Sequence, residues 1–142
     1  MKVQPLTPII GAEVSGLDLC RITDRQFDDL SDAFTEHSVL FFRDQDAMAP
    51  ADQVAFAKRF GPLHTHPAAP TLDEQDEIFV IHAHKDSKIA NGNGWHTDVS
   101  CDEEPPLATI LQLHLLPRTG GDTLFASMYA AYETLSKTMK AF

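Results

Sequence analysis

The tetrapeptide Trp95-His96-Thr97-Asp98 follows directly after a turn-rich loop, Asn91-Gly92-Asn93-Gly94. If residues 95–99 form a strand, His96 and Asp98 point to the same side, because alternate side chains of a strand share a face. An imidazole nitrogen and a carboxylate oxygen on one side make two of the three ligands in a facial triad for ferrous iron. The tetrapeptide therefore predicts a metal site, although a structural histidine beside a surface aspartate has the same pattern.

The chain before this tetrapeptide predicts two helices and a strand. Residues 24–37 place apolar side chains at helical spacing, with Thr23 or Asp24 in position to cap the first turn. A short run of β-branched and aromatic residues at 38–43 indicates a buried strand. A second helix is expected after Pro50, with Gly61 at its C-terminal end.

The later part of the chain predicts further strands and a last helix. Residues 77–82, 95–99, 108–115 and 123–126 have strand composition, and Ser127 is placed to cap a helix that follows it. Two early helices ahead of separated strands predict an α+β fold with a mostly antiparallel sheet or barrel-like core.

Composition narrows the class of protein. The 142 residues suit one folded domain spanning 1–142, and the net charge of −10 comes without a Lys/Arg cluster, which disfavours nucleic-acid and anionic-lipid partners. Apolar runs stop far short of the ~20 residues that a membrane span needs, and no leader is recognisable, so we expect a cytoplasmic protein. Cys20 and Cys101 are expected to be buried free thiols.

The expected last helix still presents an apolar face at Phe142, and the expected strands are too few to close an eight-stranded jelly roll. We therefore expect the chain to be the N-terminal part of a longer protein.

Five motifs, in this order along the chain, resemble the N-terminal half of the taurine dioxygenase (TauD/TfdA-type) family of Fe(II)- and 2-oxoglutarate-dependent oxygenases. They are Glu13-Val-Ser-Gly-Leu-Asp18, Val39-Leu-Phe-Phe-Arg-Asp-Gln45, Arg59-Phe-Gly61 with His64-Thr-His-Pro67, Trp95-His-Thr-Asp98 and Gly120-Gly-Asp-Thr-Leu124. The resemblance implies a partial, truncated double-stranded β-helix (jelly roll) with flanking N-terminal helices.

The resemblance also implies roles for individual residues. His96 and Asp98 match the first two iron ligands of the family, and Thr123 matches the residue whose hydroxyl contacts the 2-oxoglutarate carboxylate. The implied activity is oxidation of a C–H bond in a small anionic organic acid with O2. The distal histidine ligand and the arginine that binds 2-oxoglutarate come later in the family sequence, so the chain alone is expected to be inactive.

The implied substrate is related to taurine, with departures. His66 matches a position that reaches the sulfonate in taurine-oxidising members. Ala69 and Gly92 replace the tyrosine and asparagine that those members carry, and Asn93 could compensate for Gly92 by a one-residue shift. The substrate is therefore expected to be sulfonate-like, with taurine one candidate among several.

Two other classes of function suit the same residues. A shortened relative could act without catalysis, as a binding or regulatory module, and a zinc hydrolase could use His96 and Asp98. His37, His82, His84 and His114 are expected to be structural or hydrogen-bonded histidines rather than ligands. A homo-oligomer is possible on this sequence.

Overall fold

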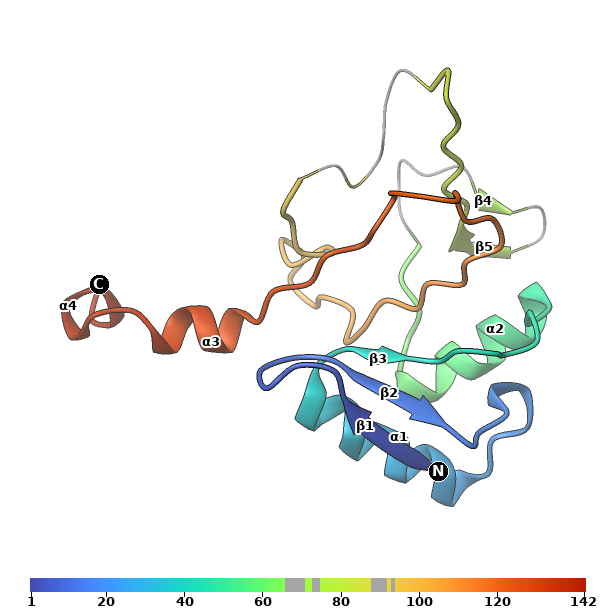
Figure 1. The fold of residues 1–142 in the computed structure, drawn as a ribbon, viewed down its shortest axis with the longest axis horizontal. Helices are drawn as coiled ribbons and strands as arrows, with labels where there is room; N and C mark the ends of the chain where they lie inside the picture. The colour runs from blue at the N-terminus through green and yellow to red at the C-terminus, as the bar shows by residue number, and fades with distance from the viewer. Residues whose placement is uncertain (66–70, 73–74, 88–91, 93) are drawn as a thin grey trace. The chain divides into compact units, whose positions relative to one another are not determined.

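A computed structural model describes residues 1–65, 71–72, 75–87, 92 and 94–142 of the chain (Figure 1). Two compact units are present, one made of Met1–Asp46 with Leu115–Phe142 and the other of Ala47–His114.

A small mixed sheet forms the first unit's framework. Strand β1 (Lys2–Pro5) pairs antiparallel with β2 (Ala12–Ser15), and β2 pairs in parallel with β3 (Leu40–Phe41). The sequence predicted β3, over a longer range, but missed β1 and β2. Two strands thus precede the helices, contrary to the expected order, and both their sequences are short and partly polar.

Helix α1 (Asp24–His37) has the predicted bounds and contacts β3. Thr23 begins it through a capping box, in which its side chain accepts from the Gln26 backbone and the Gln26 side chain accepts from the Thr23 backbone. Leu30 and Ala33 on one face are buried, as are Ala12 and Val14 of β2. These small and branched side chains form the core of the first unit. A 3-10 helix, η1 (Leu19–Arg21), lies between β2 and α1.

In the first unit, the side-chain amide of Gln45 hydrogen-bonds to backbone groups as a neighbouring strand would. Its Oε1 accepts from the Leu19 backbone N–H at 3.3 Å, and its Nε2 donates to the Leu17 carbonyl at 3.1 Å. Leu17 and Leu19 are buried, so this amide satisfies backbone groups that the sheet does not reach.

Helix α2 (Pro50–Ala57) of the second unit begins at proline, as predicted, and continues into the 3-10 helix η2 (Lys58–Phe60). Gly61 ends the helical segment with φ 139°, a backbone angle that favours glycine. Val54 and Phe56 are buried, and α2 contacts β5 (Gln75–Phe79), which pairs antiparallel with β4 (Thr71–Leu72).

The remaining predicted strands are wrong in whole or part. Strand β5 overlaps the expected 77–82 but ends at Phe79, and segments 95–99, 108–115 and 123–126 have irregular backbone. A strand exists through hydrogen bonds to a neighbour, and these segments have no ladder partner among the described residues. The last helix is two short ones, α3 (Met128–Glu133) capped by Ser127 and α4 (Lys137–Lys140) capped by Ser136.

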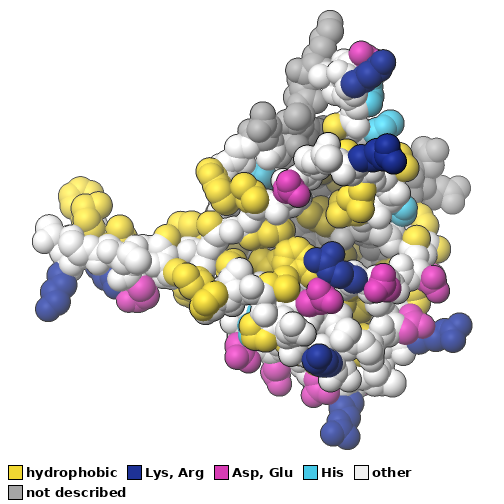
Figure 2. Space-filling view, viewed as in Figure 1, with side chains coloured by type: hydrophobic (Ala, Val, Ile, Leu, Met, Phe, Trp, Pro, Cys, Tyr) yellow, Lys and Arg dark blue, Asp and Glu magenta, His cyan; other side chains and the backbone are white. Residues whose placement is uncertain are grey.

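Large apolar side chains are exposed through much of the chain after residue 106. Figure 2 shows hydrophobic side chains along the segment that carries α3 and α4. The exposed members include Leu107, Leu111, Leu113, Leu115, Leu116, Leu124, Met128, Tyr129, Tyr132 and Met139. Cys20 and Cys101 are free, as expected, but exposed rather than buried. Among the described residues, no helix combines the length and hydropathy that crossing a membrane would require.

Replacing Leu30 with alanine should lower the free energy of unfolding by about 2–5 kcal/mol, because the side chain is fully buried and its removal leaves a cavity in the core. Urea unfolding of the complete natural protein measures the change. Ile9→Ala is the matched control, since Ile9 is exposed and its truncation should cost less than about 0.5 kcal/mol. Equal losses in the two variants would contradict this assignment of the core.

Candidate functional site

His96 and Asp98 approach each other although their segment is not a strand. The Nε2 atom of His96 lies 3.4 Å from Oδ1 of Asp98, and both side chains are about half exposed, at 56% and 50%. A turn directly after Asp98 shapes the segment: Val99 has φ 52°, and the Asp102 N–H donates to the Val99 carbonyl at 3.1 Å. The side chains of Thr97 and Ser100 hydrogen-bond across this turn.

The second ring nitrogen of His96 is held by the loop before it. Nδ1 lies 2.8 Å from the Gly94 carbonyl oxygen, and since a carbonyl only accepts, Nδ1 carries the proton. Gly92 lies against the same ring, where a Cβ would be 3.8 Å from Cε1 of His96. The Gly94 carbonyl therefore orients the imidazole with Nε2 turned toward Asp98.

The second oxygen of Asp98 is also occupied. Oδ2 accepts from the Thr109 hydroxyl at 2.7 Å, across a separation of 11 residues in sequence. Thr109 could not be found from the sequence, because nothing local links it to the Trp95–Asp98 tetrapeptide. One carboxylate thus has one oxygen toward an imidazole and the other toward a hydroxyl.

A second histidine–carboxylate pair joins the loop after α2 to the turn after Asp98. Nε2 of His64 lies 3.1 Å from Oδ2 of Asp102, with side-chain exposures of 27% and 43%. In the sequence, His64 stands out only as part of the family motif. This contact links the chain that leads to residue 66 with the chain that leads away from Asp98.

The other predicted site residues lie either in the first compact unit or outside the described residues. Thr123 is exposed and belongs to the first compact unit, whereas His96 and Asp98 belong to the second. Gly120 and Gly121 before it both have positive φ, 75° and 76°, as the predicted sharp turn requires. His66 and Asn93, and also Ala69, lie outside the described residues.

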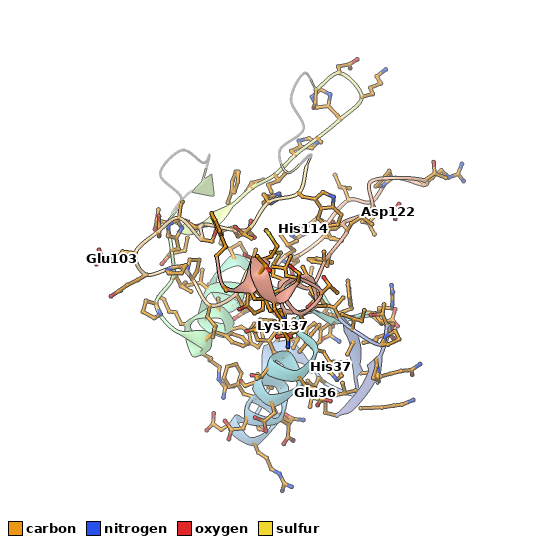
Figure 3. The ribbon with its side chains drawn as sticks, turned by 90° about the vertical axis from the view of Figure 1, so that its left-hand side faces the viewer. Glu36, His37, Glu103, His114, Asp122 and Lys137 are labelled. Carbon is orange, nitrogen blue, oxygen red and sulfur yellow. The ribbon has the colours of Figure 1, made fainter. Side chains whose placement is uncertain are left out.

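The remaining histidines have ordinary surroundings. His82 and His84 are exposed with ring centroids 5.8 Å apart, and Nδ1 of His84 accepts from the Asp86 backbone at 3.2 Å. His114 lies on the irregular chain beside Gln112, and His37 lies at the end of α1 (Figure 3). His114 is therefore not the sheet histidine that the sequence suggested. Within the described ranges, no three His, Cys, Asp or Glu side chains gather as a metal site.

Two curated relatives match the whole chain. An alkylsulfatase of Acinetobacter baylyi is 40% identical over 100% of this chain and 44% of its own length. An alpha-ketoglutarate-dependent sulfonate dioxygenase of Saccharomyces cerevisiae is 30% identical over 100% of this chain and 37% of its own length. The chain therefore spans less than half the length of either relative.

The structural comparison agrees with these matches. A crystal structure of a taurine dioxygenase from Burkholderia xenovorans superposes with a TM-score of 0.83 at 35% identity, covering 99% of this chain and 49% of that one. The family model for taurine catabolism dioxygenase TauD, TfdA family, matches residues 2–142. On this match, which covers nearly every residue, the chain belongs to the TauD/TfdA family.

Proposed function

We propose that the complete natural protein is an Fe(II)- and 2-oxoglutarate-dependent dioxygenase that oxidises a C–H bond of a small organic acid with a sulfonate-like head group. The observation that carries the proposal is the approach of His96 Nε2 and Asp98 Oδ1 to 3.4 Å in a chain of the TauD/TfdA family. These two atoms are the nitrogen and oxygen donors that the resemblance of the Trp95–Asp98 motif implies.

The electrostatics of the pair suit a cation. Because Nδ1 of His96 donates to Gly94, a neutral ring directs the lone pair of Nε2 toward the Asp98 carboxylate. Two electron-rich atoms this close repel unless a proton or a metal ion lies between them. An imidazole nitrogen and a carboxylate oxygen are ligands of non-haem Fe(II), so the residues fit the metal that the family implies.

Each residue has a separate task in this proposal. His96 and Asp98 would hold Fe(II), and the Thr123 hydroxyl would donate to a carboxylate oxygen of 2-oxoglutarate. His66 and Asn93 would bind the anionic head group of the substrate, and a histidine N–H suits such an oxyanion. Bound Fe(II) would supply the oxygen chemistry of the overall reaction, in which 2-oxoglutarate, O2 and substrate become succinate, carbon dioxide and hydroxylated substrate.

The site needs more than these residues supply. A facial triad has a third protein ligand, and a second carboxylate on 2-oxoglutarate needs a cationic partner such as arginine. We propose that residues 1–142 are the N-terminal part of one TauD-like domain built on a double-stranded β-helix. The missing histidine and arginine would come from the part of that domain that the longer relatives contain. Residues 1–142 alone would hold iron weakly and be inactive.

The names of the relatives narrow the substrate. An alkylsulfatase and a sulfonate dioxygenase both act on a sulfur oxyanion head group attached to an organic chain. Gly92 and Ala69 replace larger residues of taurine-oxidising members, which favours a substrate with an organic part different from that of taurine.

Substituting either proposed ligand tests the reaction. With Fe(II), 2-oxoglutarate and a panel of alkanesulfonates, alkyl sulfates and carboxylates, the complete protein should form succinate in a substrate-dependent way. His96→Ala and Asp98→Ala should each lose more than about 100-fold of this activity, since even an outer partner of a metal ligand costs about 10–100-fold. Succinate release and iron content are the measurements.

Thr35→Val is a matched control because its hydroxyl donates to the Ser31 carbonyl inside α1. It should keep wild-type activity. Complete protein that turns over no acid, and forms no succinate even without substrate, would overturn the enzymatic proposal in favour of a non-catalytic binding module.

Thr123→Val should raise KM for 2-oxoglutarate by about tenfold or more with a smaller effect on kcat. The reason is that a hydrogen bond to a charged group contributes about 1.5–3 kcal/mol and about 1.4 kcal/mol corresponds to a factor of ten. Steady-state kinetics at varied 2-oxoglutarate, with Thr123→Ser as the variant that keeps the hydroxyl, measure the effect. An unchanged KM in Thr123→Val would remove Thr123 from the cosubstrate site.

The two paired histidines should show opposite neutral tautomers in metal-free protein. His96 carries its proton on Nδ1, which faces Gly94, whereas His64 carries it on Nε2, which faces the Asp102 carboxylate. Nitrogen-15 chemical shifts of labelled histidines distinguish the two neutral tautomers. His96→Gln and His64→Gln assign the signals. The same tautomer in both would contradict the described ring orientations.

A further inference from the structure

The two oxygens of the Asp98 carboxylate have different neighbours. Oδ1 faces His96 Nε2 at 3.4 Å, and Oδ2 accepts from the Thr109 hydroxyl at 2.7 Å. An ionised carboxylate can only accept hydrogen bonds, so the Thr109 hydroxyl is the donor. A hydrogen bond to a charged oxygen is short and about twice as strong as one between neutral groups.

We propose that Thr109 is a positioning residue that holds the Asp98 carboxylate so that Oδ1 alone is presented to the metal. This inference rests on the proposed function of Asp98 as an iron ligand. Without the Thr109 hydroxyl, the Asp98 carboxylate could rotate and present Oδ2, or both oxygens, to the metal. Hydrogen bonds to ligating carboxylates orient them and raise metal affinity, and Thr109 is placed to make such a bond.

The segment that carries Thr109 is anchored nearby. Three residues later, Gln112 pairs with both backbone groups of Met48: its Oε1 accepts from the Met48 N–H at 2.7 Å, and its Nε2 donates to the Met48 carbonyl at 3.1 Å. Met48 is buried beside the start of α2. Thr109 therefore donates from a segment that is fixed to the second unit although it is not a strand.

His96 has an equivalent restraint from the Gly94 carbonyl. The restraint on the imidazole comes from backbone, so a side-chain substitution does not remove it. The restraint on the carboxylate comes from a side chain, and Thr109 is the residue whose substitution can release it.

Metal affinity of the complete natural protein tests the proposal. Cobalt(II) is the probe, titrated while its visible absorption is recorded. Thr109→Val removes the hydroxyl at similar volume and should weaken Co(II) binding by about tenfold, the lower end of the usual effect of outer-sphere partners. The visible spectrum should also change, because a released carboxylate alters the coordination of the ion. Thr109→Ser keeps the hydroxyl and should restore both affinity and spectrum.

The controls separate this inference from the function on which it rests. Thr35→Val makes the same chemical change inside α1 and should bind Co(II) as wild type does. Thr109→Ala serves as a second variant if Thr109→Val loses its cooperative thermal unfolding. Wild-type affinity and spectrum in the folded variant that lacks the hydroxyl would overturn the role of Thr109 alone. If His96→Ala binds Co(II) as tightly as wild-type protein does, the metal site itself is overturned, and this inference with it.

Discussion

The site depends on one electrostatic constraint: an imidazole nitrogen and a carboxylate oxygen are held within 3.4 Å of each other. The Gly94 carbonyl keeps the proton of His96 on the far side of the ring, and the Thr109 hydroxyl occupies the far oxygen of Asp98. When the His96 ring is neutral, no proton therefore lies between Nε2 of His96 and Oδ1 of Asp98. Both restraints lie within the second compact unit, so residues 94–109 themselves organise the pair that is proposed to hold the metal.

The sequence was sufficient to predict a helix or turn whose stabilising features lie within a few neighbouring residues. Helix α1 was predicted over its observed range, because its apolar spacing lies within its own 14 residues and its cap, Thr23, directly precedes them. The stop of η2 at Gly61 and the turn at Gly120–Gly121 follow from glycine in the same way. The proximity of His96 and Asp98 was also anticipated from two-residue spacing, although a turn at Val99 accompanies it where a strand was expected.

Strands and contacts that depend on residues far apart in the chain could not be predicted from one sequence. Strands β1 and β2 are short, and their pairing depends on each other and on β3. Segments 108–115 and 123–126 have strand composition but no ladder partner among the described residues. The Thr109–Asp98 and His64–Asp102 contacts join residues 11 and 38 positions apart, and no periodicity in the sequence predicts them. The roles of Thr123, His66 and Asn93 remain predictions.

Gln45 and Gln112 each use a side-chain amide where a strand would use backbone, and each gives one donor and one acceptor to the chain opposite. This arrangement is sensitive to chemical ageing. Hydrolysis of the Gln112 amide to a carboxylate would replace its donor by an acceptor and set a negative charge against the Met48 carbonyl. A single deamidation would therefore loosen the segment that carries Thr109 without touching either proposed ligand.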